Sequence, residues 1–191
     1  MASLSCTPKS DRKSSNKPML VDQIKEQLET TGKFESLSIS RGDLYAVADK
    51  GRLIEICEYL RENHNLQFDF LSMITATDYL GKPGKRFEVV YSLYSIAHHH
   101  RIMLLVRVDE EEEVPSLTGL WDTANFQERE VYDMFGLRFS GHPNLTRILM
   151  DDDWVGYPQR KDFPLTYETP EFSHNLDKIK VDDKTPGSDV F

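Results

Sequence analysis

Two neighbouring segments, residues 87–96 and 102–108, are the strongest strand candidates in the chain because both are dense in Val, Ile, Leu and Tyr. The short polar stretch 97–101 joins them. A third apolar segment, residues 68–77, precedes them and is followed by the Gly- and Lys-rich loop 81–85. Three strands connected this closely predict a mostly antiparallel sheet at the centre of the fold.

The flanking segments predict helices and shorter strands around this sheet. Apolar residues at helical spacing indicate helices, and Gly or Pro marks their ends. The predicted elements are a helix at 18–28 followed by Gly32, strands at 34–40 and 44–48, a helix at 51–62 capped by Asp49, a short helix at 117–120 and a helix at 124–135 ended by Gly136. The inward stripe of the helix at 51–62 is expected to be Leu53, Ile56, Cys57 and Leu60. This order of elements predicts the α+β class, with helices covering the sheet.

The chain divides into three parts by composition. Residues 1–18 are rich in Ser, Lys and Pro, which predicts a disordered tail. Residues 19–136 contain all the predicted elements and form the α+β core domain. Residues 137–191 contain recurring prolines and no clear periodicity, so we expect a long, irregular C-terminal extension that wraps a partner.

The net charge of −9, from 23 Lys and Arg against 32 Asp and Glu, argues against a nucleic-acid-binding protein, because phosphate contacts need a basic surface. The acidic run 109–113 is expected to be a solvated turn. No apolar run approaches the roughly 20 residues that span a bilayer, and no signal-peptide core is seen. We therefore expect a soluble, cytoplasmic chain. Its two cysteines, Cys6 and Cys57, cannot hold an iron–sulfur cluster alone.

The segment 128–165 combines charged residues, aromatics and Gly or Pro turns. Such a mixture suits either an active site or a shaped surface that binds other proteins. Glu128 and Glu130 cannot form a paired-carboxylate site, because a helix that turns about 100° per residue points them roughly 200° apart. We interpret Arg129 and Asp133 as an intrahelical ion pair, with one of the glutamates bonded elsewhere.

Two other clusters contain possible metal ligands without the required spacing. The acids at 151–153 lack the pattern of an EF-hand, and we expect them to cap a helix or turn and to pair with Arg147, Arg160 or Lys161. His98 and His100 would share one face of a strand, but no third ligand follows, so a solvated loop is expected. His142 lies in a Gly-His-Pro bend, where its ring is expected to cap or pair. No catalytic residue, cofactor-binding residue or metal ligand is therefore assigned.

The same segment resembles a known family, the 30 kDa subunit of NADH-quinone oxidoreductase (respiratory complex I), which in bacteria is called the C subunit. Residues 128–136 read EREVYDMFG and match the family's ERE-x-x-D signature. The later motifs GHP, RIL, DDW and RKDFPL keep the family's order and spacing. The match over residues 128–165 is highly specific, whereas the predicted sheet agrees only in length and pattern.

The resemblance assigns a set of signature and interface residues within this segment. They are Glu128, Arg129, Glu130, Asp133, His142, Arg147, Trp154, Tyr157, Arg160, Lys161, Asp162 and Phe163. Two departures from the family occur: Thr146 stands where an Arg or Lys is usual, and 156–159 reads GYPQ where GHPL is common. These departures affect single ion pairs and leave the charged frame of the motif intact.

The resemblance implies a non-catalytic scaffold and assembly subunit in the hydrophilic, peripheral arm of a proton-translocating NADH:quinone oxidoreductase. In such a respiratory-chain translocase, electrons would pass from NADH to quinone through FMN and Fe–S clusters held by other subunits. This chain would hold no cofactor. Its partners would be the 49 kDa quinone-site protein, known as the D subunit, and the B and I subunits that carry Fe–S clusters, with no nucleic acid. It would lie on the cytoplasmic side of the bacterial inner membrane and contact the membrane only through the complex.

In this hypothesis Trp154, Tyr157 and Phe163 serve as buried aromatic anchors, and the basic residues meet carboxylates on neighbours or within the chain. One alternative within the family is the equivalent subunit of a ferredoxin- or F420-linked dehydrogenase or of a membrane hydrogenase. Two alternatives lie outside it. The first is a stand-alone metal-dependent hydrolase that uses residues 151–153 with Glu128, and the second is a free-standing binding protein.

Overall fold

A computed structural model of the 191-residue chain describes residues 21–164. In chain order the elements are α1 (Val21–Thr31), β1 (Ser36–Ser40), β2 (Asp43–Ala48), the 3-10 helix η1 (Lys50–Arg52), α2 (Leu53–Glu62), β3 (Phe70–Asp78), β4 (Phe87–Ser95), β5 (His100–Val108), β6 (Val114–Pro115), α3 (Ala124–Phe135) and β7 (Phe139–Ser140). The predicted α+β class is confirmed. The tail predicted at 1–18 and the extension from residue 165 onward lie outside the described residues.

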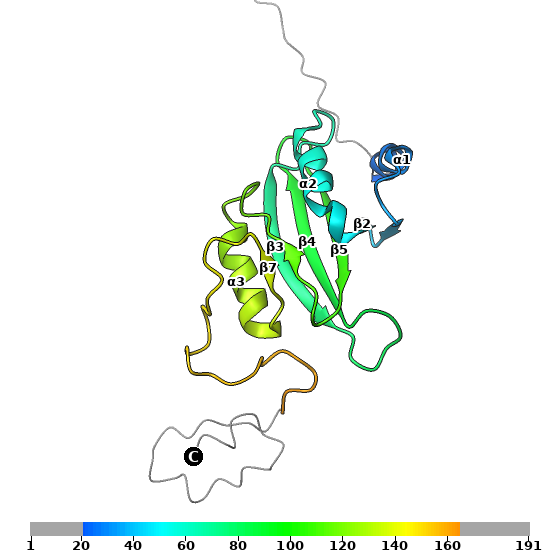
Figure 1. The fold of residues 1–191 in the computed structure, drawn as a ribbon. Coiled ribbons are helices and arrows are strands. Elements are labelled where there is room, and N and C mark those ends of the chain that lie inside the picture. Colours follow the sequence, from blue (N-terminus) through cyan, green and yellow to red (C-terminus); the bar gives the residue numbers. More distant parts are fainter. Residues whose placement is uncertain (1–20, 165–191) are drawn as a thin grey trace, which may run out of the picture.

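Five strands form the main sheet in the order β1-β2-β5-β4-β3, and Figure 1 shows α2 lying across one face of its long strands. β3, β4 and β5 are antiparallel neighbours, with Phe87 opposite Val108 and Ser95 opposite His100. The predicted strands at 68–77, 87–96 and 102–108 are therefore confirmed as the centre of the fold. β2 pairs in parallel with β5, because the chain crosses over through α2 and the β3–β4 hairpin before it returns to β2.

Side chains alternate across β5, since successive residues of a strand point to opposite faces. Ile102, Leu104 and Val106 are fully buried on one face, whereas Arg101 and Arg107 point to the other face and are exposed. Each aliphatic side chain buried in this way stabilises the fold by about 1.5–3 kcal/mol. The alternation therefore fixes which face of the sheet belongs to the core.

The predicted apolar stripe of α2 is confirmed. All four of its side chains are fully buried: Leu53, Ile56, Cys57 and Leu60. Asp49 also acts as a cap, although it caps the 3-10 helix η1 that precedes α2: its carboxylate accepts a hydrogen bond from the backbone N–H of Gly51 at 2.9 Å. Burial raises the pKa of the Cys57 thiol, so this cysteine acts as a small apolar core residue.

α3 lies beside β3 and completes the core (Figure 1). Val131, Met134 and Phe135 are buried, and the ring of Phe135 meets that of Phe87 edge-on, with centroids 6.5 Å apart. The short parallel pair of β6 and β7 then returns the chain from α3 to the segment that follows β5. The C-terminal extension consequently starts from a fixed point on the core.

Two predicted elements differ in detail. Residues 117–120 form a turn instead of a helix, with the N–H of Trp121 donating to the carbonyl of Leu117 at 3.0 Å. The first helix, α1, continues to Thr31, beyond the predicted end at residue 28. None of the helices between residues 21 and 164 is long and apolar enough to cross a membrane.

The acidic run 109–113 is more than the solvated turn that the sequence predicted. Glu112 accepts hydrogen bonds from Lys85 at 2.7 Å, from Lys50 at 3.0 Å and from the backbone N–H of Asp109 at 2.9 Å. The contact with Lys85 is the main reason that the pKa of Glu112 falls to about 2. Basic side chains from η1 and from the β3–β4 loop thus meet this run at one end of the sheet.

Candidate functional site

The extension predicted to be irregular from residue 137 first forms the short strand β7, and we call its remaining described part, residues 141–164, the strap. The strap contains no helix or strand, as predicted, and Figure 1 shows it running along and below α3. A segment without regular backbone hydrogen bonds needs other partners to hold one conformation. In this chain the partners are side chains of α3 and of the sheet.

A buried carboxylate on α3, Asp133, holds the beginning of the strap. Its Oδ2 accepts hydrogen bonds from three consecutive backbone N–H groups, those of Ile148 (3.1 Å), Leu149 (2.7 Å) and Met150 (2.9 Å). Its Oδ1 accepts from Nη1 of Arg147 at 2.7 Å. Burial alone would raise the pKa of Asp133, but the four donors outweigh it and lower the pKa. We call this arrangement the Asp133 clamp.

Arg147 also closes the strap onto itself. Its Nη2 donates to the carbonyl oxygens of Trp154 and Gly156, both at 3.0 Å. Its guanidinium lies over the Tyr157 ring, 5.4 Å from the centroid. Arg147 therefore binds α3 through Asp133 and also binds the strap backbone at Trp154 and Gly156. The residues between Arg147 and Trp154 form a loop that is fixed at both ends.

The predicted ion pair between Arg129 and Asp133 is wrong. Nε of Arg129 donates to the carbonyl of Thr146 at 3.1 Å, and Nη2 donates to the carbonyl of Arg147 at 2.9 Å. Both side chains point from α3 to the strap, where backbone groups without regular partners compete for them. Arg129 thus becomes a second attachment of the strap to the helix.

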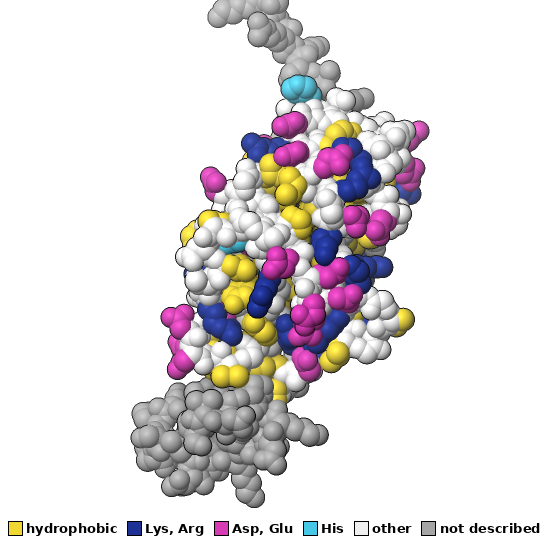
Figure 2. All heavy atoms as spheres, viewed as in Figure 1, with side chains coloured by type: hydrophobic (Ala, Val, Ile, Leu, Met, Phe, Trp, Pro, Cys, Tyr) yellow, Lys and Arg dark blue, Asp and Glu magenta, His cyan; other side chains and the backbone are white. Residues whose placement is uncertain are grey.

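An ion-pair network around Arg86 fixes the other end of the strap to the sheet. The guanidinium contacts Asp78 at 3.1 Å, Glu110 at 2.9 Å and Asp162 at 2.8 Å. Asp78 also accepts from the backbone N–H of Lys161 at 2.9 Å. Burial alone would raise the pKa of Asp78, but its hydrogen bonds to these donors lower it. Figure 2 shows such acidic and basic side chains interleaved over this face of the molecule.

Arg160 and Tyr157 connect the strap to the end of α3. Nε of Arg160 donates to the carbonyl of Phe135 at 2.5 Å, and Nη1 pairs with Glu110. The guanidinium of Arg160 lies 4.5 Å from the centroid of the Tyr157 ring. That ring fills the space beside Gly136, where an added Cβ would come within 2.5 Å of Tyr157 Cε2. Gly136, the predicted end of α3, therefore supplies both a left-handed turn (φ 75°) and room for the strap.

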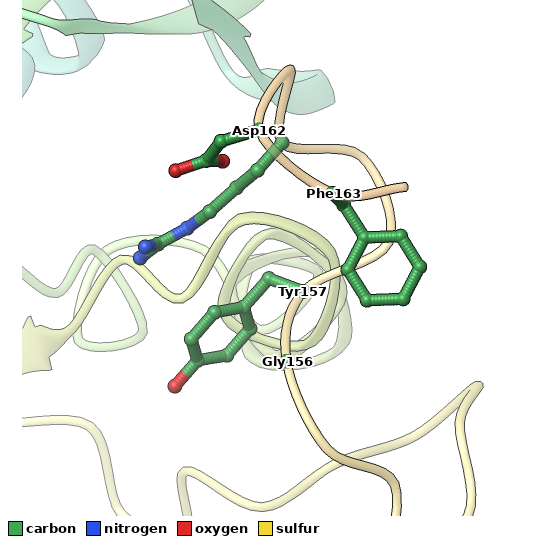
Figure 3. Close-up of a pocket in the computed structure, with 5 residues that line it drawn as sticks. Gly156, Tyr157, Asp162 and Phe163 are labelled. Carbon is green, nitrogen blue, oxygen red and sulfur yellow. The ribbon is translucent and has the colours of Figure 1, made fainter. Parts of the chain in front are cut away.

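The last described residues of the strap surround a small pocket. Its lining consists of Gly156, Tyr157, Arg160, Asp162 and Phe163. Figure 3 shows Tyr157 and Asp162 pointing to the same side, while Phe163 points away from them. Phe163 stacks on Trp154, with ring centroids 6.3 Å apart. Trp154 and Phe163 thus pack on each other within the strap, whereas Tyr157 packs beside Gly136 at the end of α3. Contact with a partner stays a prediction for all three of these suggested anchors.

The two glutamates of the signature occupy opposite environments, as helix geometry predicted. Glu128 is fully buried and accepts hydrogen bonds from the N–H of Leu117 at 2.7 Å and from the hydroxyl of Ser116 at 2.6 Å. Glu130 is exposed and has no ion pair with the described residues. The prediction that one glutamate bonds elsewhere is confirmed, and Glu128 and Glu130 do not converge on one site.

Glu128 gives the chain a predictable pH dependence. Burial raises its pKa above the ordinary value of 4.5, even though Ser116 and Leu117 donate to it. A carboxyl with a raised native pKa contributes its full stabilisation below the unfolded pKa, and this contribution is lost as the pH rises from the unfolded pKa through the native pKa. We therefore expect the wild type to lose stability relative to Glu128→Gln when the pH rises above about 4.5, as measured by urea denaturation. The control Glu130→Gln should follow the wild type, and a wild type that gains stability over Glu128→Gln would contradict this assignment.

The histidines bond to backbone groups. Nε2 of His142 contacts the carbonyl of Asn125 at 3.1 Å and its Nδ1 accepts from the N–H of Asn144 at 3.1 Å, so the predicted pairing in the bend is confirmed. His100 is buried instead of solvated, because β5 begins two residues earlier than predicted. Its Nε2 contacts the carbonyl of Leu66 at 2.9 Å, and burial lowers its pKa.

The acids Asp151, Asp152 and Asp153 are exposed and make no side-chain hydrogen bond or ion pair with the described residues. Their expected pairing with nearby guanidiniums is wrong, because Arg147 binds Asp133 and Arg160 binds Glu110. Between residues 21 and 164 no group of three or more His, Cys, Asp or Glu side chains is arranged to hold a metal ion.

Three residues of the site were missed by the sequence prediction: Asp78, Arg86 and Glu110. They lie far from the strap in sequence, and the sheet brings them to it. A partial signal exists, because Asp78 immediately follows one predicted strand and Arg86 immediately precedes the next. The antiparallel register, with Asp78 opposite Phe87, then places the two side chains together.

Comparison with known proteins identifies a family whose sequence model matches this chain. The family model described as "Respiratory-chain NADH dehydrogenase, 30 Kd subunit" matches residues 46–169. The NADH-quinone oxidoreductase C subunit of Roseiflexus sp. (strain RS-1) is 50% identical over 140 residues, which cover 73% of this chain and 80% of the relative. The C subunit of Herpetosiphon aurantiacus is 43% identical over 163 residues, which cover 84% of this chain and 95% of the relative.

Two solved structures are also similar. One is described as the trypsin-resistant fragment (1–134) of Nqo5; it is 36% identical, with a TM-score of 0.56, and the match covers 66% of this chain and 100% of the fragment. The other is a chain of an archaeal membrane-bound sulfane sulfur reductase, with a TM-score of 0.63, 22% identity and coverage of 86% and 97%. The second likeness shows a shared fold only.

Proposed function

The chain belongs to the family of the 30 kDa subunit of respiratory-chain NADH dehydrogenase, and on that premise we propose that it is a non-catalytic scaffold subunit of an NADH-quinone oxidoreductase. Its α+β core would act as a rigid base, and the strap would be the surface that attaches the core to neighbouring subunits. The names of the relatives favour NADH as the donor of the whole complex over the ferredoxin- and F420-linked alternatives.

The Asp133 clamp is the observation that carries this proposal. An irregular segment would be expected to sample many conformations, but here one buried carboxylate fixes three consecutive backbone N–H groups of the strap. Arg129 and the Arg86 network fix it at further points. Ordering a segment before it binds removes an entropic cost that binding would otherwise have to offset. A pre-ordered, irregular strap is therefore suited to docking.

The buried carboxylates of the site support a structural role over a catalytic one. Asp133, Glu128 and Asp78 each accept hydrogen bonds from groups of this chain. A carboxylate that acts on a substrate needs a free oxygen within hydrogen-bond reach of the reacting group. We accordingly place the chemistry of the complex, including its FMN, its Fe–S clusters and its quinone site, in other subunits.

The partners follow from the same premise. We propose that the strap contacts the 49 kDa quinone-site protein, the D subunit, with the Fe–S-carrying B and I subunits nearby. The assembled complex would lie on the cytoplasmic side of the inner membrane.

Co-purification from native membranes tests the proposed function. A tagged full-length chain, expressed in place of the untagged one and extracted in mild detergent, is expected to bring down the other hydrophilic subunits together with NADH:quinone activity. The subunits are identified by mass spectrometry. Recovery of the tagged chain alone, or with subunits of an unrelated enzyme, would overturn the proposal.

A further inference from the structure

We propose that residues 148–155 of the strap form a docking surface for a partner that offers an aliphatic socket rimmed by Lys or Arg side chains. This inference rests on the proposed function, and it concerns which part of the strap makes the contact. We call these residues the docking turn. Arg147 holds the turn from behind, because it donates to the carbonyl oxygens of Trp154 and Gly156.

The Asp133 clamp determines what the docking turn presents outward. Because the N–H groups of Ile148 and Leu149 point to the buried carboxylate, their backbone is fixed against α3. Their side chains remain in solvent, with Leu149 63% exposed and Ile148 37% exposed. Val155, at the other end of the turn, is 42% exposed. Single exposed aliphatic residues are ordinary, but three on one short segment that is held rigid from below make a pre-formed contact surface.

The charge of the docking turn specifies the rim of its partner. Asp151, Asp152 and Asp153 lie between the exposed aliphatic residues and have no side-chain partner among the described residues. Figure 2 shows acidic side chains gathered at the lower left, where Figure 1 places the strap beside α3. The cations nearest in sequence are already engaged, since Arg147 binds Asp133 and Arg160 binds Glu110. Three uncompensated carboxylates therefore favour a partner that supplies positive charge.

The occupant that fits both features is a protein surface of the same complex, with Leu149 inserted into an apolar pocket and basic side chains facing the three acids. Aliphatic side chains enclosed by such a polar rim are typical of the centre of an interface. A second copy of this chain fits less well, because each copy would bring the same three acids to the contact. An anionic membrane surface would repel them for the same reason.

The test uses the tagged full-length chain in native membranes. In Leu149→Ser we expect the amount of chain recovered in the complex after a high-salt wash to fall roughly tenfold or more, as for a central interface residue. The matched control, Ile96→Ser, alters a side chain that is 56% exposed in the turn between β4 and β5 and should leave recovery unchanged. Equal recovery for Leu149→Ser and the wild type would overturn the proposal that residues 148–155 form the docking surface.

The charge component is tested separately. The triple variant Asp151→Asn, Asp152→Asn, Asp153→Asn should flatten the salt dependence of retention in the complex, because the screened attraction is lost. The control triple variant Glu26→Gln, Glu58→Gln, Glu62→Gln removes the same charge from α1 and α2 and should keep the wild-type salt dependence. The same salt dependence in both triple variants would contradict the proposed basic rim.

A photo-crosslinking residue at position 149 identifies the occupant. The expected product joins position 149 to an aliphatic segment, flanked by Lys or Arg, of another subunit of the complex. A product with a second copy of this chain, or with lipid only, would overturn the inference. If the wild-type chain co-purifies with the complex and these variants are retained like the wild type, the proposed docking turn is wrong and the proposed scaffold function is unaffected. If the wild type does not co-purify, the function itself fails.

Discussion

Asp133→Ala is expected to lower the free energy of unfolding by about 3–5 kcal/mol, because it leaves the Arg147 guanidinium, whose side chain is only 15% exposed, without its partner carboxylate. Three backbone N–H groups of the strap lose their acceptor at the same time. The strap should therefore detach from α3 even where the core remains folded. Urea denaturation measures the first effect, and amide hydrogen exchange at positions 148–150 measures the second.

The control for this variant lies on the same helix. Glu130→Ala removes an exposed acid of α3 that has no ion pair with the described residues, and it should change the free energy of unfolding by less than about 0.5 kcal/mol. Amides 148–150 should remain protected in Glu130→Ala and exchange rapidly in Asp133→Ala. Comparable destabilisation by the two variants would contradict the clamp.

The clamp also predicts a pH dependence of the opposite sign to that of Glu128. The native pKa of Asp133 lies below its ordinary value of 3.8 because its four donors outweigh the effect of burial. A lowered native pKa stabilises the fold above the unfolded pKa, and the contribution is lost as the pH falls through the native value. The gap in stability between the wild type and Asp133→Ala should therefore narrow below about pH 4, where denaturation curves can follow it.

Gly136→Ala is expected to be destabilising by roughly 2–5 kcal/mol, the sum of two separate effects. The left-handed backbone at φ 75° disfavours any residue with a Cβ by about 1–2 kcal/mol. The new Cβ would also meet the Tyr157 ring at 2.5 Å and Arg160 Nη2 at 2.6 Å, and such overpacking costs about 1–3 kcal/mol. Relief of the clash requires Tyr157 to move, which would separate the strap from the end of α3.

Gly32→Ala separates the two effects. Gly32 follows α1 as Gly136 follows α3, and it has a similar φ of 60°, but an added Cβ there meets no atom within 4 Å. We expect Gly32→Ala to show only the backbone effect of about 1–2 kcal/mol. Thermal or urea unfolding of both variants measures the difference. If the two substitutions were equally destabilising, Tyr157 would not be packed against Gly136 as described.

Local signals in the sequence were sufficient to predict the central strands and the α2 stripe. β4 and β5 could be identified because they are dense in β-forming residues and separated by a short polar turn. α2 could be identified because Leu53, Ile56, Cys57 and Leu60 repeat at helical spacing. Gly136 was identified as the end of α3, although the sequence did not reveal that Tyr157 packs against it. These features depend on neighbours in sequence, which periodicity reports directly.

The contacts between distant segments could not be predicted in the same way. The parallel pairing of β2 with β5 depends on a crossover, for which the two strand sequences contain no signal. The partner of Asp133 was expected four residues earlier on the same helix, because helical spacing was the only geometry available. The observed partner, Arg147, lies in a segment without periodicity, so its direction could not be inferred from spacing.

Which charged side chains are buried could not be predicted for the same reason. Glu128 and Glu130 have the same chemistry, and helix geometry predicted only that they point apart. Which of them is buried depends on Ser116 and Leu117, in a turn that follows β6. The contacts of the acidic run 109–113 similarly depend on Lys85 in the β3–β4 loop and on Lys50 in η1.

The clamp, the Arg86 network and the docking turn together describe a strap that the core holds ready for a partner. A variant that detaches the strap from the core should therefore impair assembly of the complex more than a variant that loses the same stability elsewhere in the fold. Ile56→Ala provides the comparison, because it removes a fully buried side chain of α2 far from the strap and should be destabilising by about 2–5 kcal/mol.

The most direct measurement is therefore the amount of NADH-quinone oxidoreductase that contains the tagged chain, determined in native membranes for the wild type, Asp133→Ala and Ile56→Ala at a temperature where all three chains are folded. Asp133→Ala should be largely absent from the assembled complex, whereas Ile56→Ala should be incorporated like the wild type. Incorporation of Asp133→Ala at the level of Ile56→Ala would contradict the claim that the clamped strap attaches this protein to its partners.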